Sequence, residues 1–298
     1  MTELKTPTLG DVLAAFHQIF PPALAEKWDA SGLVVGRAGA PVSRVGFAVD
    51  PTLATAREAV EQGAGLLITH HPLLLRGASF LPDTDYKGNI VHTLIEGGCG
   101  LLGAHTNVDS APHGTNEAFM NKLGISESQI LADQATALIE GKEVLTGIGR
   151  IGSLAEPISL EELAQKIAEF LPPTAAGLRI AGRKDQLVQK IALCTGAGDS
   201  LLGQARASGA DVYITADLRH HPASEAREQA LISGGSPALI DCSHFASEWV
   251  WMDRAADLLI DKLEKQGYGI DTYVSRLNTD PWDFTLETGQ VAGSASTR

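Results

Sequence analysis

The sequence predicts an α/β protein made of two similar α/β units. Segments patterned as strands alternate with segments patterned as helices along most of the chain. One strand–helix–strand block, "RVGFAVDPTLATAREAVEQGAGLLITHHP", is echoed later by "KIALCTGAGDSLLGQARASGADVYITADLRHHP". The length of 298 residues, of which 44% are hydrophobic, suits one large or two medium α/β domains. We therefore expect a duplicated strand–helix–strand unit whose strand ends face one another.

In the first half of the chain, helix breakers and apolar spacing delimit the elements. Residues 9–20 are spaced as an amphipathic helix, which Pro21 and Pro22 stop. A helix over 53–63 ends on a glycine, and the short apolar run 66–69 has the character of a buried strand. The same criteria predict strands over 44–50 and 101–105, and helices over 89–96 and 114–124.

The second half is marked by one clear helix start and one long helix. The helix over 159–173 opens with a capping box, Ser159 with Glu162, and closes on prolines. The helix over 246–265 carries its apolar residues on one side, as a helix facing a core does. The other predicted elements are strands over 143–152, 177–182, 190–196, 211–216 and 238–242, and helices over 200–208 and 224–231.

The change of character after residue 125 gives a division of the chain. The first α/β unit covers residues 1–125, and the second covers residues 126–275, whose C-terminal helix could pack on the first unit. Residues 276–298 form a C-terminal extension. Its small, polar end, "LETGQVAGSASTR", is predicted to be disordered.

Charge and composition exclude several classes of protein. The formal net charge is −13, and no cluster of Lys and Arg stands out, so general nucleic-acid binding is disfavoured. The three cysteines lie far apart without a CxxC motif, which indicates reduced, mostly buried thiols of a cytoplasmic protein. The N-terminus lacks the pattern of a signal peptide, and no apolar run is long enough to span a membrane.

Histidines and acids follow the predicted strands in both halves. His70 and His71 end one strand, and a second strand delivers His105 with Asp109 four residues later. In the second half, "SPALIDCSHFASE" echoes "CGLLGAHTNVD" and delivers His244, with Glu248 four residues later. Because functional groups of α/β sheets gather beyond the carboxyl ends of the strands, we expect these side chains to lie close together.

This set of side chains predicts a site for two metal ions between the two units. Imidazoles and carboxylates are the ligands of borderline first-row divalent metals. Adjacent residues leaving a strand point in opposite directions, so two ions suit His70 and His71 better than one, with Glu248 as the bridging carboxylate. Such a pair of ions polarises a substrate oxygen and activates water, which is hydrolytic chemistry.

Weaker signals carry alternative interpretations. A lone pair of histidines is more often two ordinary side chains, and an HxxxD or HxxxE spacing alone is common on helices. His220 and His221 occupy the place of His70 and His71 in the echo, but they lie beyond "ADLR" and fit a supporting or substrate-facing role better. The segment "GAGDS" is more often a tight turn than a phosphate site, and Ser243 beside His244 lacks the context of a catalytic triad.

At these residues the sequence resembles the Nif-three-like family, whose members are named GTP cyclohydrolase 1 type 2 homologs. The matching segments keep their order and cover most of the chain: "AEKWDASGLVVG", "LLITHHPLLL", "YKGNIVHTLIEGGCGLLGAHTNVDSAPHGTNEAF", "GADVYITADLRHHPA" and "DCSHFASEW". The resemblance implies a two-domain α/β protein, a toroidal homohexamer and a dinuclear metal centre in each subunit. It also implies the compact form of the family, without an inserted domain. The implied ligands are His70, His71, Asp109, His244 and Glu248, with His105 as a further ligand or close neighbour.

We therefore expect a metal-dependent hydrolase acting on a nucleotide or a related heterocycle. Its two divalent ions would be zinc first, with iron, manganese or cobalt as alternatives. His105 and His220 are the candidates for moving protons. The family name implies action on GTP, but a triphosphate favours several Arg or Lys side chains, and the matching segments offer few. The alternative is a non-catalytic, metal-handling or regulatory hexamer; a ring threaded by nucleic acid would need a basic channel.

Overall fold

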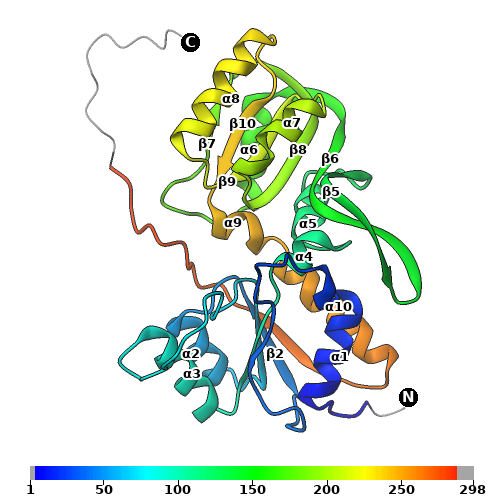
Figure 1. Ribbon diagram of the computed structural model, residues 1–298, viewed down its shortest axis with the longest axis vertical. Helices are drawn as coiled ribbons and strands as arrows, with labels where there is room; N and C mark the ends of the chain where they lie inside the picture. Colours follow the sequence, from blue (N-terminus) through cyan, green and yellow to red (C-terminus); the bar gives the residue numbers. More distant parts are fainter. Residues whose placement is uncertain (1–3, 287–298) are drawn as a thin grey trace.

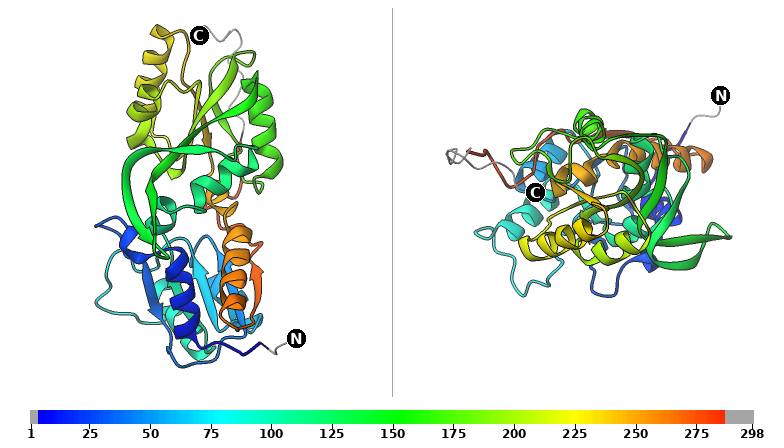
Figure 2. Two further views of the ribbon diagram at one scale, coloured as in Figure 1. Left: turned by 90° about the vertical axis from the view of Figure 1, so that its right-hand side faces the viewer. Right: turned by 90° about the horizontal axis from the view of Figure 1, so that it is seen from above.

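The computed structural model describes residues 4–286 and consists of two lobes, each built on one β-sheet (Figure 1). The sheet of the first lobe has five strands, in the order β1 (Gly32–Val35), β4 (Gly100–Gly103), β3 (Leu66–Thr69), β2 (Arg44–Ala48) and β11 (Asp271–Val274). The sheet of the second lobe has six strands, in the order β5 (Ser128–Ile139), β6 (Lys142–Ser159), β8 (Leu187–Ala197), β9 (Val212–Ala216), β10 (Ala238–Cys242) and β7 (Arg179–Ala181). Helices accompany both sheets (Figure 2), which confirms the predicted α/β class.

Helices cover both faces of the first sheet. The helices are α1 (Leu9–Ile19) and α10 (Met252–Lys265) on one face, and α2 (Leu53–Glu61) and α3 (Tyr86–Glu96) on the other. Because successive side chains of a strand point to opposite faces, Leu66 and Ile68 join the core under α1 and α10, whereas Leu67 joins the core under α2 and α3. This burial on both faces explains why β3 has an unbroken apolar sequence.

The second sheet follows the same principle. The helices are α5 (Thr115–Lys122) and α6 (Leu160–Phe170) on one face, and α7 (Leu202–Ala207), which follows the 3₁₀ turn η2 (Asp199–Leu201), with α8 (His220–Ile232) on the other. In β8, Ile191 and Leu193 join the first of these cores and Ala192 the second. The predicted capping box at the start of α6 is confirmed: Ser159 accepts from the backbone of Glu162, whose side chain accepts from the backbone of Ser159.

Each sheet contains three parallel strands that follow one another along the chain. They are β2, β3 and β4 in the first lobe, and β8, β9 and β10 in the second, with helices in the connections between successive strands. This shared order agrees with the echo in the sequence. A duplication of the unit stays a prediction.

The C-terminal part of the chain returns from the second lobe to the first. The division by sequence placed residues 126–275 together, with only the last helix packing on the first unit. In the structure α10 packs against α1, and β11 pairs in parallel with β2 as the edge strand of the first sheet. The helix expected over 246–265 is two helices, α9 (His244–Trp249) and α10, and the break lets α9 pack against β8 and β9 of the second lobe while α10 packs on the first.

Short helices and buried thiols complete the fold. The 3₁₀ turn η1 (Pro22–Leu24) contacts α4 (Thr106–Ser110), and α4, α5 and α9 lie between the two lobes (Figure 1). All three cysteines are free and buried, as expected. Within residues 4–286, no helix is both long and apolar enough to cross a membrane. The end of the chain predicted to be disordered lies, beyond Leu286, outside the described residues.

Candidate metal centre

Histidines and carboxylates from both lobes meet where the parallel strands end. His70 and His71 follow β3 in the first lobe, and His105 follows β4. Asp109 lies in α4, while His244 and Glu248 lie on α9 of the second lobe, directly after β10. The six residues that were expected to hold metal are therefore brought together: His70, His71, His105, Asp109, His244 and Glu248.

The carboxylate of Glu248 lies at the centre of the imidazoles. Its Oε1 is 3.3 Å from Nε2 of His70 and 3.1 Å from Nε2 of His244, and its Oε2 is 3.1 Å from Nε2 of His71. The ring of His105 lies against the rings of His70 and His71, with centroids 5.3 and 5.6 Å away. The side chain of Glu248 is almost completely buried, so the histidines around it must compensate its negative charge.

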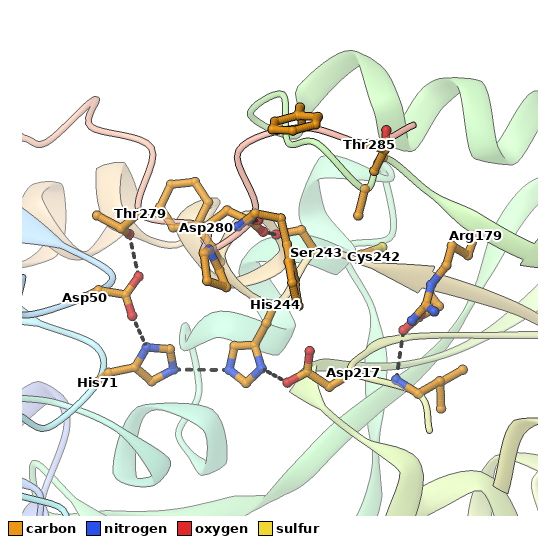
Figure 3. Close-up of a pocket in the computed structure, with 18 residues that line it drawn as sticks. Asp50, His71, Arg179, Asp217, Cys242, Ser243, His244, Thr279, Asp280 and Thr285 are labelled. Carbon is orange, nitrogen blue, oxygen red and sulfur yellow. Dashed lines mark hydrogen bonds and ion pairs between the residues drawn. The ribbon is translucent and has the colours of Figure 1, made fainter. Parts of the chain in front are cut away.

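The other nitrogen of each imidazole is fixed by an oxygen. Nδ1 of His71 lies 2.7 Å from Asp50, and Nδ1 of His244 lies 2.7 Å from Asp217 (Figure 3). Nδ1 of His105 is 2.9 Å from the buried Asp29, and Nδ1 of His70 is 2.9 Å from the carbonyl oxygen of Ala104. Ionised carboxylates and carbonyls only accept hydrogen bonds, so each Nδ1 carries a proton and donates it. Each Nε2 therefore presents a lone pair whenever its ring is neutral.

These converging lone pairs fit a bound cation. Nε2 of His71 and Nε2 of His244 face each other at 3.1 Å, an arrangement that two neutral rings of this tautomer would oppose. Nε2 of His70 and Oε2 of Glu248 are buried and make no hydrogen bond within the described part of the chain. Buried polar atoms without partners are costly, and a divalent ion among imidazoles and carboxylates satisfies them. Two overlapping groups could hold an ion, His70, His71 and His105, and His71, His244 and Glu248.

The electrostatics of the cluster favour positive charge among the histidines. Burial opposes protonation of His71, but the carboxylates of Glu248 and Asp50 outweigh it and raise the pKa of this imidazole to about 10. The same balance, dominated by Glu248, raises the pKa of His244 to about 11. Burial favours a neutral Glu248, but the neighbouring imidazolium charges hold its pKa well below the usual range. The negative charge that holds protons on these rings also attracts a metal cation, which replaces the protons when it binds.

Asp109 is held at the edge of the cluster by hydroxyl groups. Its Oδ1 lies 3.7 Å from Nε2 of His70 and accepts a hydrogen bond of 2.5 Å from the hydroxyl of Thr115. Thr195 of β8 in turn donates to Thr115, so this chain of hydroxyls links the carboxylate to the second sheet. Burial raises the pKa of Asp109 despite the charge of His70.

A glycine makes room for the central carboxylate. Gly196, at the end of β8, has φ +67°, and a Cβ there would collide with Oε1 of Glu248. Its N–H donates to the hydroxyl of Ser247, which fixes the loop against α9. This is the first glycine of the "GAGDS" segment, and its close approach to Glu248 is the physical reason for a glycine at this position.

A cavity of about 710 Å³ opens beside the cluster. His71 and His244 line it, together with the carboxylates of Asp50 and Asp217 that bind their Nδ1 atoms (Figure 3). The cavity therefore reaches two of the six candidate ligands, His71 and His244. It is bounded on the opposite side by residues near the C-terminal end of the described chain, including Asp280.

One predicted site residue lies away from the cluster. His220 starts α8 and is exposed; its ring packs against that of His221, and it lines a different, shallow cavity. The structure gives no contact between His220 and the cluster among the described residues, and its proton-moving role stays a prediction. The echo placed it near His70, but the loop after β9 carries Asp217 toward the cluster instead, where its carboxylate binds His244.

Three carboxylates that orient the imidazoles were missed from the sequence: Asp29, Asp50 and Asp217. A signal existed for two of them, because Asp50 ends one predicted strand and Asp217 directly follows another, in positions like those of the histidines. Asp217 adopts φ +56°, a conformation that Asp tolerates better than most residues with a side chain. Asp29 lies in a loop, and its buried contact with His105 follows only from the fold.

Fold and site together define a two-lobed α/β protein with a histidine–carboxylate centre suited to divalent metal. The model of the Duf34/NIF3 (NGG1p interacting factor 3) family matches residues 7–281. The chain therefore belongs to this family.

Similar proteins agree with this assignment. The GTP cyclohydrolase 1 type 2 homolog of Streptomyces coelicolor is 42% identical over 276 residues, covering 93% of this chain and 94% of the relative. The homolog of Mycobacterium tuberculosis is 31% identical in an alignment of 382 positions, covering 95% of this chain and 98% of the relative; it carries residues that the 298-residue chain lacks, as expected of a compact family member.

Solved structures show the same fold. A hypothetical protein of Staphylococcus aureus superimposes with a TM-score of 0.81 at 28% identity, covering 94% of this chain and all of that one. A Bacillus cereus protein related to NIF3 gives a TM-score of 0.82 at 23% identity, with 94% and 100% coverage.

Proposed function

We propose that the protein is a metal-dependent hydrolase whose centre holds two divalent ions. The observation that carries this proposal is the convergence of three Nε2 atoms, those of His70, His71 and His244, on Glu248, with the Nδ1 of each ring held by an oxygen. Mixed imidazole and carboxylate ligation suits zinc first, and iron, manganese or cobalt as alternatives. The proposed ligands are His70, His71, His105, Asp109, His244 and Glu248.

Two ions fit this arrangement better than one. His71 belongs to both groups that could hold an ion, but its one free Nε2 serves a single ion. The other members differ, with His70 and His105 in one group and His244 and Glu248 in the other. The two oxygens of Glu248 face different imidazoles, which suits a carboxylate that bridges two ions. Asp109 lies beside His70 and adds a second carboxylate at the first group.

The chain's own residues would orient and move protons around the ions. When bound, divalent ions polarise a substrate oxygen and activate water. Asp50 and Asp217 keep the Nδ1 protons of His71 and His244 in place, which points each Nε2 into the centre. His105, held by the buried Asp29, is the remaining candidate for moving a proton if it is not itself a ligand.

The cavity supports a hydrolase more than a metal-handling protein. A site that only exchanges metal ions needs an opening no wider than an ion, whereas the cavity of about 710 Å³ has the size of a small-molecule site. The names of the relatives point to a nucleotide or heterocycle as substrate. Assembly as a homohexamer is part of the proposal, and the mass of the protein in solution tests it.

Metal analysis tests the proposed centre. Purified protein, loaded with zinc and desalted, should hold about two ions per chain by elemental analysis. Glu248→Ala should lose metal, whereas Glu225→Ala, which removes an exposed carboxylate from α8, should not. Full occupancy in Glu248→Ala would contradict the bridging role. Screening the loaded protein against nucleotides and heterocycles, with Asp109→Ala as the blank, then tests hydrolysis, and turnover that persists in the blank would remove this site from the reaction.

A further inference from the structure

The cavity beside the candidate metal centre has one wall formed by residues 275–286, which we name the C-terminal strap. The strap leaves β11 in the first lobe and passes along the second lobe (Figure 1). At its start, the indole N–H of Trp249 donates to the carbonyl of Ser275, and the guanidinium of Arg276 lies 4.7 Å from the centre of the Trp249 ring. Near its end, Thr285 donates to the carbonyl of Ala175.

The middle of the strap lines the cavity and is bound to both lobes. The hydroxyl of Thr279 donates to Asp50, the carboxylate that also holds His71 (Figure 3). The next residue, Asp280, accepts a hydrogen bond from Ser243 in the second lobe. The strap is therefore a built wall of the cavity, tied to the carboxylate that orients one proposed ligand.

Two aromatic side chains of the strap line the cavity with most of their surface uncovered. Trp282 is 67% exposed and Phe284 is 74% exposed, although both belong to the cavity wall. Aromatic side chains this exposed beside a cavity offer flat faces on which a planar ring can stack. A volume of about 710 Å³ lies within the usual range for small-molecule sites.

Carboxylates outnumber the cationic groups that line the cavity. Four carboxylates contribute to its wall: Asp50, Asp217, Asp241 and Asp280. Arg179 is the one Lys or Arg among the described residues of the wall, and its guanidinium is paired with Asp241. The imidazoles of His71 and His244 are paired with Asp50 and Asp217, so Asp280 is the one carboxylate of the described wall without a cationic partner there. A polyanion meets repulsion here, whereas ring N–H and amino groups meet acceptors.

We propose that this cavity binds a planar nitrogen heterocycle without phosphate groups, a nucleobase or nucleoside, stacked on the aromatic residues of the strap. The proposal rests on the proposed function, because it names the substrate class of that same centre. It also assigns the strap as the segment that determines specificity. The ring would lie between Trp282 and the corner where β10 meets α9, and its N–H groups would donate to Asp280 or Asp241.

Calorimetry with defined probes tests the substrate class separately from the metal. Guanosine, adenosine and GTP are titrated into chelator-treated protein and into zinc-loaded protein whose metal content is known. In the metal-free protein, at least one nucleoside should bind at least tenfold more tightly than GTP. Metal loading should reduce this preference for nucleoside over GTP, because bound cations attract the phosphate groups of GTP. Tighter binding of GTP in the metal-free protein, or no binding of either nucleoside, overturns the proposal whatever the metal content is.

Variants test the strap itself. Trp282→Ala and Phe284→Ala should each weaken nucleoside binding by at least tenfold without changing the zinc content, because neither residue belongs to a group that could hold a metal ion. The matched control is Phe80→Ala, which removes an aromatic side chain that is 85% exposed and lies outside the cavity. Asp280→Asn should reduce the preference for nucleoside over GTP. Unchanged nucleoside affinity in both aromatic variants overturns the role of the strap, and loss of zinc from wild-type protein would instead count against the proposed centre.

Discussion

Replacing Gly196 with alanine tests whether Glu248 is fixed at the centre of the cluster. Gly196 has φ +67°, a left-handed conformation that costs a residue with a Cβ about 1–2 kcal/mol. The new Cβ would also collide with Oε1 of Glu248 and lie 3.3 Å from Nε2 of His244. Glu248 has little room to withdraw, because imidazole nitrogens surround both of its oxygens. With about 1–3 kcal/mol for overpacking, Gly196→Ala should lower the free energy of unfolding by about 2–5 kcal/mol.

Urea denaturation of the metal-free protein measures this loss, and elemental analysis measures the metal retained by the variant. Gly209→Ala is the control for backbone conformation: it has φ +71°, with Lys190 Nζ at 3.9 Å as its one neighbour, and should cost about 1–2 kcal/mol alone. Gly203→Ala, in α7 with nothing within 4 Å, should stabilise the protein by about 0.5–1 kcal/mol. Equal losses for Gly196→Ala and Gly209→Ala, with unchanged metal content, would refute the reasoning.

Three further predictions concern the imidazoles and a buried arginine. In the metal-free protein, the raised pKa values of His71 (about 10) and His244 (about 11) stabilise the folded state fully below about pH 6.5, and this contribution is lost as the pH rises through 10 to 11. Urea denaturation of chelator-treated protein at low, neutral and high pH should therefore give falling free energies of unfolding above neutrality, and a rising series would contradict the pKa shifts. Asp50→Asn and Asp217→Asn should each weaken zinc affinity by about 10–100-fold in competition with a chelator, since they remove the acceptors that orient the imidazoles; unchanged affinity would exclude this role. The buried guanidinium of Arg150 donates to three backbone carbonyls, so Arg150→Met should lower the free energy of unfolding by about 3–5 kcal/mol in the same urea assay. A loss below about 1 kcal/mol would show that these hydrogen bonds are dispensable.

Local patterns in the sequence predicted much of the secondary structure. The capping box at Ser159 is a signal within four residues, and it places the start of α6 correctly. The apolar runs 66–69 and 238–242 match β3 and β10, because strands buried on both faces need unbroken apolar sequence. The cluster of histidines was predictable for a related reason: parallel strands end at one edge of a sheet, so residues that follow them meet.

Contacts between distant segments could not be read from local patterns. β11 is a short, half-buried strand whose partner β2 lies at the other end of the chain, and no local signal links the two. The contact of Asp29 with His105 likewise depends on the fold. His220 was placed near the cluster because the echo matched letters, whereas α8 begins at that residue and turns its side chain toward solvent.

The return of β11 to the first sheet has a consequence for biosynthesis. β2 pairs with β3 soon after both are made, but its other edge stays open until the whole second lobe has been synthesised. Open strand edges invite pairing between chains, and closing so long a loop slows folding. A nascent chain that has not yet released β11 is therefore the form of this protein most exposed to aggregation. Chaperone binding or codon-dependent pausing is expected to change the yield most while β11 is being made, long after β3 and β4 and the histidines that follow them.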